Sequence, residues 1–185
     1  TYGSGGTDSC RNTVEAVSGL LYGINITHYI AFTMDAVVQV NDLLGGVTLT
    51  MLDDFTSISP EMRKGERVVL TGDMALAYVR ARYGLEDSSN HRRMERQRQY
   101  LTELSNVASA RFSADEDFAL KLLNAVSEYL ISDCTMNQLS QAYGRWEAYA
   151  DGGIRTIEGD TVESEEFMEF YPDEDALKQL VAELF

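Results

Sequence analysis

The sequence predicts an α/β protein, a three-layer α/β/α sandwich with a central mixed β-sheet. Short runs rich in β-branched and aromatic residues alternate along the chain with segments whose apolar residues recur at helical spacing. Hydrophobic residues make up 44% of the 185 residues, and there are only two prolines, which is typical of a globular chain that buries a core. Because no internal repeat or low-complexity tract interrupts the pattern, we expect one domain over residues 1–185.

Capping residues and glycines mark the helices of the first hundred or so residues. Thr7 or Asp8 caps the first helix and Gly23 ends it. Gly45 closes the second, and Thr71 caps the third. The expected helices span 8–22, 34–44, 71–79 and a long segment from about Ser89 to near Phe112.

The strands of the same region are predicted by β-branched and aromatic runs. His28 lies on the first of them, where we interpret it as a structural residue. Residues 53–67 contain Pro60 and Gly65 and are expected to form an exposed excursion. Residues 1–7 are a glycine-rich loop without the Lys-Ser/Thr of a P-loop. The expected strands span 27–33, 47–52 and 68–70.

The C-terminal part continues the alternation. Two helices are expected over 115–131 and 136–149, and Trp146 on the second is interpreted as a packing residue. Two strands, 154–158 and 165–170, then flank an acidic turn, and Asp173 caps a last helix that runs to Leu184.

A cationic cluster stands out in an acidic protein. Residues 80–98 carry six of the fifteen basic residues and three acids, a net charge of +3 in a chain of net −15. Guanidinium groups suit a phosphate or diphosphate guest, because a planar fork donates to two oxygens at once and stays charged. The alternative is a solvated charged helix face, which the charge pattern alone supports equally. The six are Arg80, Arg82, Arg92, Arg93, Arg96 and Arg98.

The spacing of these residues favours convergence. Arg93 and Gln97 are four apart, on one helix face, and Asn90 lies one turn earlier. Arg80 and Arg82 share a face only if their helix ends by about residue 79 and the chain becomes extended. Near a helix N-terminus, the backbone amides and the dipole also favour a negative group.

Other chemistry-bearing residues leave alternatives open. Asp53 and Asp54 at a strand end suit a hard cation, although such a pair is more often a solvated turn, and the turn is favoured. Cys10 and Cys134 are either a disulfide or two free thiols.

Two further classes of site are not supported by the sequence. His28 and His91 stand apart and no Cys-x-x-Cys is present, so no metal site is expected. No Ser-His-Asp or Cys-His set has a recognisable local context, which disfavours nucleophilic catalysis.

Short motifs occur in a fixed order along the chain. The order and spacing resemble the LytR-CpsA-Psr family, over essentially the whole chain and most strongly over residues 2–104. The opening of the chain resembles an internal loop of that family, so we expect an N-terminally truncated domain that lacks a membrane anchor. The motifs are Tyr2-Gly3-Ser4-Gly5-Gly6, Leu44-Gly45-Gly46-Val47, Gly72-x-x-Ala75-Leu76-x-Tyr78-x-Arg80-x-Arg82 and Arg93-x-x-Arg96-Gln97.

The resemblance implies a cell-envelope phosphotransferase. Members of the family move a glycopolymer such as teichoic acid or capsule from a polyprenyl-pyrophosphate carrier onto peptidoglycan. Mg²⁺ binds the pyrophosphate and the prenyl chain enters an apolar tunnel. The resemblance therefore places the protein at the extracellular face of a Gram-positive bacterial membrane, with a lipid-linked glycopolymer and peptidoglycan as partners.

The resemblance also carries residue roles. It implies that Arg80, Arg82, Arg93 and Gln97 contact the pyrophosphate, and Arg96 belongs to the same motif. The family usually has aspartate where this chain has Asn90, which hydrogen-bonds but is no general base. The family's magnesium-binding aspartates match positions before residue 1, so we expect this chain alone to be weakly active or inactive.

Two rival functions remain open at this point. One is a module that binds polyprenyl pyrophosphate without turnover, which Asn90 favours. The other is an envelope-related regulator that binds nucleic acid. A net charge of −15 argues against nucleic acid, since such binding rests on phosphate neutralisation over a broad surface.

Overall fold

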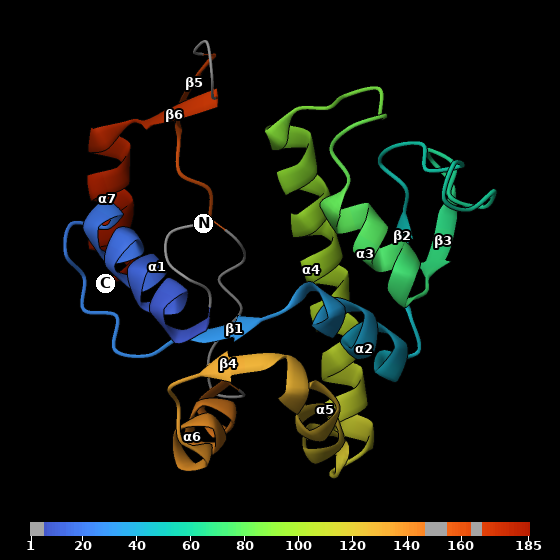
Figure 1. Cartoon of the computed structure of the whole chain (residues 1–185), viewed down its shortest axis with the longest axis horizontal. Helices are drawn as coiled ribbons and strands as arrows, with labels where there is room; N and C mark the ends of the chain where they lie inside the picture. Colours follow the sequence, from blue (N-terminus) through green and yellow to red (C-terminus); the bar gives the residue numbers. More distant parts are fainter. Residues whose placement is uncertain (1–5, 147–154, 164–167) are drawn as a thin grey trace. The chain divides into compact units, whose positions relative to one another are not determined.

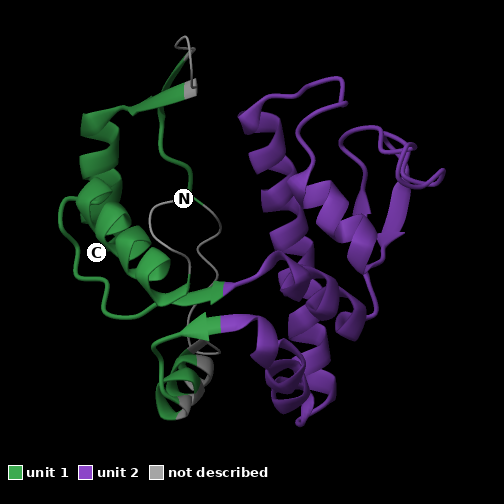
Figure 2. Ribbon diagram, in the orientation of Figure 1, with its two compact units in different colours: residues 1–31, 131–185 green, residues 32–130 purple. Residues whose placement is uncertain are grey.

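The computed structural model describes residues 6–146, 155–163 and 168–185. The chain divides into two compact units, residues 32–130 and residues 1–31 with 131–185 (Figure 2). The expectation of a single domain over residues 1–185 stays a prediction. The elements, in chain order (Figure 1), are α1 (Gly6–Leu20), β1 (Ile30–Phe32), α2 (Met34–Leu44), β2 (Val47–Thr50), β3 (Arg67–Leu70), α3 (Gly72–Arg80), α4 (Asn90–Ala114), α5 (Phe118–Val126), the 3-10 helix η1 (Ser127–Tyr129), β4 (Leu130–Ser132), α6 (Met136–Trp146), β5 (Gly159–Glu163), β6 (Met168–Pro172) and α7 (Glu174–Leu184).

The predicted α/β class is confirmed. The described strands pair as three separate two-stranded sheets, β1 with β4, β2 with β3 and β5 with β6, rather than as one central sheet. The β2–β3 pair is antiparallel, with Val47 opposite Leu70 and Thr50 opposite Arg67. The β5–β6 pair is also antiparallel.

The core of the 32–130 unit lies where β2, β3, α3 and α4 meet. Alternate residues of β2 and β3 point into it, as expected for strands with one covered face. Most residues of the segment between the two strands are exposed, as Pro60 and Gly65 predicted, but the segment is not exposed throughout. Phe55 and Met62 are buried there, and the Phe55 amide donates to the Met62 carbonyl at 2.8 Å. Two large apolar side chains therefore fold this segment back onto the core.

Helices α2 and α3 approach each other closely at Gly72. A side chain at this position would come within 2.5 Å of Val38 Cγ1 and 2.9 Å of the Val38 carbonyl oxygen. The Gly72 amide donates to Asp42 Oδ1 at 2.7 Å. Thr71 does occupy the N-cap position of α3, as predicted, but its side chain makes no capping hydrogen bond. The Asp42 carboxylate satisfies the first amide of the helix in its place.

Local capping signals placed most helix boundaries of this unit correctly. Helix α2 spans Met34–Leu44 as predicted, and Gly45 follows it at φ 86°, a left-handed conformation that favours glycine. Ser89 caps α4 by accepting from the Arg92 amide at 3.1 Å. The helix predicted over 115–131 is too long, because α5 ends at Val126 and the chain turns through η1 into β4. The Tyr129 carbonyl there accepts from the Thr33 amide at 2.9 Å.

The unit formed by residues 1–31 and 131–185 contains α1, α6, α7 and the β5–β6 pair. Asp173 caps α7, as predicted, by accepting from the amides of Asp175 and Ala176 at 3.0 and 2.9 Å. The two strands lie later in the chain than predicted, over 159–163 and 168–172. The expected loop at residues 1–5, the end of the helix predicted to residue 149, and residues 154 and 165–167 lie outside the described residues, as does the side chain of Trp146.

Cys10 and Cys134 are both free thiols, so the disulfide alternative is not formed. Within the described ranges, no helix combines the length and the apolar character that crossing a membrane requires.

The contact at Gly72 predicts a specific loss of stability. Gly72→Ala should destabilise the protein by about 1–3 kcal/mol, because the added methyl overpacks the α2–α3 contact. Gly19→Ala is the matched control, since Gly19 is also helical and has nothing within 4 Å of the added carbon. That change should be neutral or stabilising. Urea unfolding of the two variants tests this, and equal midpoints would contradict the close approach.

Candidate functional site

The candidate site lies where the C-terminal end of α3 faces the N-terminal half of α4. Helix α3 ends at Arg80, and Ala81 is extended at φ −58° and ψ 136°. This confirms the break that the spacing of Arg80 and Arg82 required. The basic residues of the cluster then separate into two sets, one that pairs with Asp53 and one that does not.

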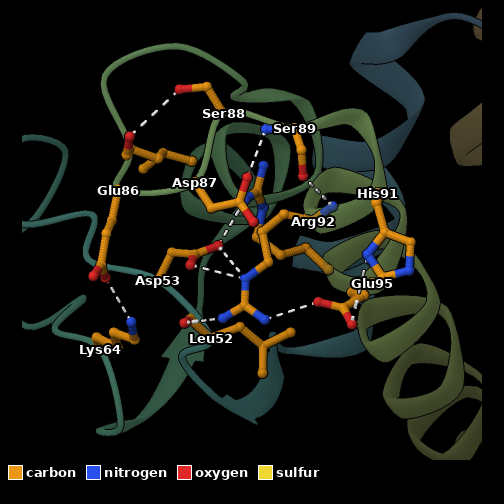
Figure 3. A network of polar contacts seen from close by, with 12 residues as sticks. Leu52, Asp53, Lys64, Glu86, Asp87, Ser88, Ser89, His91, Arg92 and Glu95 are labelled. Carbon is orange, nitrogen blue, oxygen red and sulfur yellow. Dashed lines mark hydrogen bonds and ion pairs between the residues drawn. The ribbon is translucent and has the colours of Figure 1, made fainter. Parts of the chain in front are cut away.

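The first set is organised by Asp53, which follows β2 and is 2% exposed. Its carboxylate accepts from Arg92 Nε at 2.9 and 3.2 Å and from Arg96 Nη1 at 2.7 Å. Figure 3 shows the Arg92 side of this network, in which Arg92 also donates to Glu95 at 2.8 Å and to the Leu52 carbonyl. The preferred reading of Asp53 as part of a solvated turn is therefore wrong. A buried carboxylate must be paired, and here two arginines pair it.

Arg96 is buried completely. Its Nε donates to the Tyr78 carbonyl at 3.0 Å, and its Nη2 donates to the Ala81 carbonyl. The guanidinium carbon also lies 5.5 and 6.0 Å from the ring centres of Phe55 and Tyr78. Each of its three nitrogens thus has a partner within the protein. Arg96 thus holds the end of α3 against α4, and its assignment to the ligand stays a prediction.

Tyr78 connects this network to the sheet. Burial raises the pKa of Tyr78 to about 12, so the hydroxyl keeps its proton at neutral pH. It donates to Gln99 Oε1 at 2.6 Å and accepts from the Leu52 amide at 3.3 Å. The residue before Asp53 is thereby fixed to α3, and the carboxylate is presented to α4.

The second set contains the remaining predicted residues. Arg80 is exposed, and Arg82 is half-buried, with its Nε donating to the Ser88 carbonyl at 3.2 Å. Arg93 Nη2 donates to Asn90 Oδ1 at 2.6 Å. Gln97 Nε2 donates to the Val79 carbonyl at 3.0 Å. The structure therefore brings Arg93, Gln97 and Asn90 together at the start of α4, near the last turn of α3.

Among the described residues, Arg93 alone has a buried side-chain nitrogen or oxygen without a hydrogen-bond partner. Its Nε is buried and has no hydrogen-bond partner among the described residues. A buried guanidinium nitrogen without an acceptor carries a desolvation cost, and functional sites are a common reason for tolerating such a group. It lies in the first turn of α4, where the helix dipole favours an anion. An anion at this place would satisfy both demands.

The described residues do not fit a Mg²⁺ site beside these arginines. Both oxygens of Asp53 are taken by arginines. Asp54 accepts from the Thr56 amide and hydroxyl, and Asp87 accepts from the Ser89 amide at 2.8 Å. Among the residues described, no group of three His, Cys, Asp or Glu side chains gathers here. Hard cations need several oxygen ligands, and the described residues beside these arginines do not gather them.

The sequence did not predict that Asp53 pairs with Arg92 and Arg96. One signal was present, since Arg92 and Arg96 are four apart and must share a helix face. Their acid lies about forty residues earlier in the chain, at separations of 39 and 43. No local pattern connects residues that far apart.

The ion network predicts that Asp53 is a stability determinant. Asp53→Asn should destabilise the protein by about 3–5 kcal/mol, because two arginines lose the charge that compensates them in a buried site. Asp54→Asn is the matched control at an exposed neighbour and should leave the unfolding midpoint nearly unchanged. Denaturant unfolding followed by circular dichroism measures both, and equal behaviour of the two variants would refute the buried role of Asp53.

The sequence of this chain is similar to those of characterised bacterial proteins. The polyisoprenyl-teichoic acid–peptidoglycan teichoic acid transferase TagU of Halalkalibacterium halodurans is 34% identical over 160 residues, covering 85% of this chain and 48% of that protein. Biofilm regulatory protein A of Streptococcus mutans is 27% identical over 180 residues, covering 88% of this chain and 41% of that protein. The chain thus spans about half the length of the curated relatives it matches.

The fold is also similar to that of solved structures. The crystal structure of B. subtilis TagV superposes with a TM-score of 0.68 at 24% identity and covers 94% of this chain and 68% of that one. The model of the LytR_cpsA_psr family matches residues 1–184. The chain therefore belongs to the LytR-CpsA-Psr family.

Proposed function

We propose that this chain forms the pyrophosphate-binding part of a domain that transfers a glycopolymer from a polyprenyl-pyrophosphate carrier onto peptidoglycan. The observation that carries the proposal is the buried Nε of Arg93, which has no partner among the described residues and lies at the start of α4. Arg80, Arg82 and Gln97 are the other groups assigned to the ligand. The arginines of the cluster that Asp53 does not pair would, in a chain of net charge −15, suit an anionic ligand.

Phosphoryl transfer suits these groups. The reaction depends on positioning and on neutralising charge at the phosphoryl oxygens, and it needs no protein nucleophile. The arginines of the second set would contact the ligand, while Asp53 and Arg96 hold the two helices in place. Asn90 accepts from Arg93 and so orients that guanidinium, which is a role that an amide fills as well as a carboxylate does.

Asp87 is one of the described carboxylates near this cluster, but it is poorly suited to be the general base of the reaction. Hydrogen bonds from Ser89 lower the pKa of Asp87. A carboxylate with a lowered pKa is a weaker proton acceptor at neutral pH. Asn90 has no basic group. Activation of the acceptor hydroxyl is therefore assigned to residues outside the described cluster.

The remaining parts of the proposal rest on the family. The relatives' name specifies a polyisoprenyl-linked teichoic acid and peptidoglycan, and we propose the same classes of partner for this chain. We also propose a location at the extracellular face of the membrane, a membrane anchor preceding the described residues, and Mg²⁺ at the pyrophosphate. The described residues form no group of three carboxylates beside the arginines, so we propose that other carboxylates complete the metal site.

A binding module without turnover is the second candidate. It is favoured by the lack of a general base beside the arginines and by Asn90. The two functions differ in one readout, since only a transferase moves labelled glycopolymer to peptidoglycan. Tight lipid pyrophosphate binding by a full-length protein that shows no transfer would establish the module.

Removal of the Arg93 guanidinium should weaken ligand binding. We expect Arg93→Ala to lower the affinity for a short polyprenyl-pyrophosphate analogue by about 10- to 100-fold, since a charge-assisted contact contributes about 1.5–3 kcal/mol. Arg98→Ala is the matched control, because Arg98 is an exposed arginine on the same helix. Isothermal titration calorimetry measures both. Unchanged affinity in Arg93→Ala, or equal losses in the two variants, would overturn the assignment.

The metal requirement gives a separate prediction. Binding of the pyrophosphate analogue by residues 1–185 should be the same with and without added Mg²⁺, because no described carboxylate cluster lies beside the arginines. A fall in the dissociation constant on adding Mg²⁺ would show that Asp54, Asp87 or another local carboxylate coordinates the ion.

A further inference from the structure

We propose that His28, Asp133 and Cys134 form a binding site for a zinc-class transition metal ion, in the unit formed by residues 1–31 and 131–185. Their ligand atoms all lie within 4.8 Å of one another. His28 precedes β1 and the other two follow β4, so the pairing of these strands brings the three together. The site is independent of the arginine cluster and of the function proposed above.

The donor set selects the kind of metal. A thiolate and an imidazole are ligands of zinc and similar ions, whereas Mg²⁺ and Ca²⁺ prefer oxygen. Three protein ligands would leave a fourth tetrahedral position for water. Metal bonds of about 2.0–2.3 Å place ligand atoms roughly 3.3–3.8 Å apart, so closing around an ion requires a movement of about 1 Å. The side chains of His28 and Asp133 are 43% and 37% exposed, which gives an ion access.

Hydrogen bonds hold the backbone that carries these ligands. The Tyr29 amide donates to Asp133 Oδ1 at 3.0 Å, and Ser132 Oγ donates to the Tyr29 carbonyl at 2.9 Å. The Cys134 amide in turn donates to Ser132 Oγ at 3.0 Å. Two segments more than a hundred residues apart are thus connected through Tyr29, next to the cluster. Supporting hydrogen bonds of this kind orient metal ligands in known sites.

Gln138 determines which nitrogen of the His28 ring carries the proton. It belongs to a capping box at the start of α6. The side-chain Oε1 of Gln138 accepts from the Thr135 backbone amide at 2.7 Å, and the backbone amide of Gln138 donates to Thr135 Oγ1 at 3.3 Å. Its Nε2 is therefore the atom that faces His28 Nε2, at 2.8 Å. Because that amide nitrogen can only donate, Nε2 of the imidazole accepts and Nδ1 carries the proton, 3.4 Å from Asp133 Oδ1.

Metal binding must then shift one proton. The ion bonds to His28 Nδ1, to the Asp133 carboxylate and to Cys134 Sγ. The Nδ1 proton and the thiol proton leave, one proton is taken up at Nε2, and about one proton per ion is released to solvent. The new N–H at Nε2 faces Gln138, whose amide must turn so that its oxygen accepts. The side chain of Gln138 therefore opposes the metal in its present orientation, and a carboxylate at this position would favour it.

Cobalt titration tests the proposal on the 185-residue chain without a histidine tag. We expect one Co²⁺ per chain, a thiolate-to-cobalt absorption band, displacement by Zn²⁺, and a rise of the melting temperature with Zn²⁺. Cys134→Ser should abolish the band and His28→Ala should weaken binding, whereas Cys10→Ser and His91→Ala, the matched controls for the other thiol and the other imidazole, should change neither. Circular dichroism checks that each variant is folded, and Cys134→Ala replaces the serine variant if that variant is not.

Gln138→Glu provides the sharpest readout. Glutamate preserves the capping box and offers an acceptor to the Nε2 proton, so we expect Co²⁺ affinity to rise by up to about 10-fold. A random collection of surface ligands would not respond to this change in that way. The proposal is overturned if the band survives Cys134→Ser, if Cys10→Ser removes it, if Gln138→Glu weakens binding, or if the chain binds no Co²⁺ stoichiometrically.

Discussion

The buried carboxylate of Asp53 is the constraint on which the arginine-rich end of the 32–130 unit depends. A charge that is 2% exposed is tolerated only when it is paired and hydrogen-bonded. Arg92 and Arg96 satisfy it from one face of α4, and Arg96 also binds carbonyls at the end of α3. The start of α4, the end of α3 and the end of β2 are therefore joined at one point. Two arginines of the cationic cluster therefore hold in place the helix ends that carry the other arginines.

This division gives the two arginine sets different physical tasks. Arg92 and Arg96 have acceptors in the protein, so their charges are compensated without any ligand. Arg93 lies between them on the same helix, yet its Nε has no acceptor among the described residues. Arg93 is thus the arginine of the cluster with an unused buried donor, and the proposed anion site rests on this observation. Family membership gives that anion its proposed chemical identity.

Local sequence signals predicted the elements with strong boundaries. Helix α2 with Gly45, α4 with Ser89 and α7 with Asp173 were all placed to within a few residues, because caps act on the amides next to them. The end of α5, the burial of the Phe55 and Met62 side chains, and the capping of α3 by Asp42 were not predicted. Each of these depends on a contact between residues far apart in the chain. The burial of Asp53 and the proximity of His28 to Cys134 were not predicted for the same reason. The placement of Arg93 and Gln97 on one helix face, by contrast, followed from their spacing alone.

The dependence of the site on Asp53 is tested most directly by a double-mutant cycle between Asp53 and Arg96. Asp53→Asn, Arg96→Met and the double variant are compared by urea unfolding, with Asp53 and the exposed Arg98 as the control pair. The network predicts that the double variant loses less stability than the two single losses together, with an interaction free energy of about 0.5–3 kcal/mol, while the control pair is additive. Additivity at Asp53 and Arg96 within about 0.5 kcal/mol would contradict the account, because a buried charge and its partner cannot be removed independently.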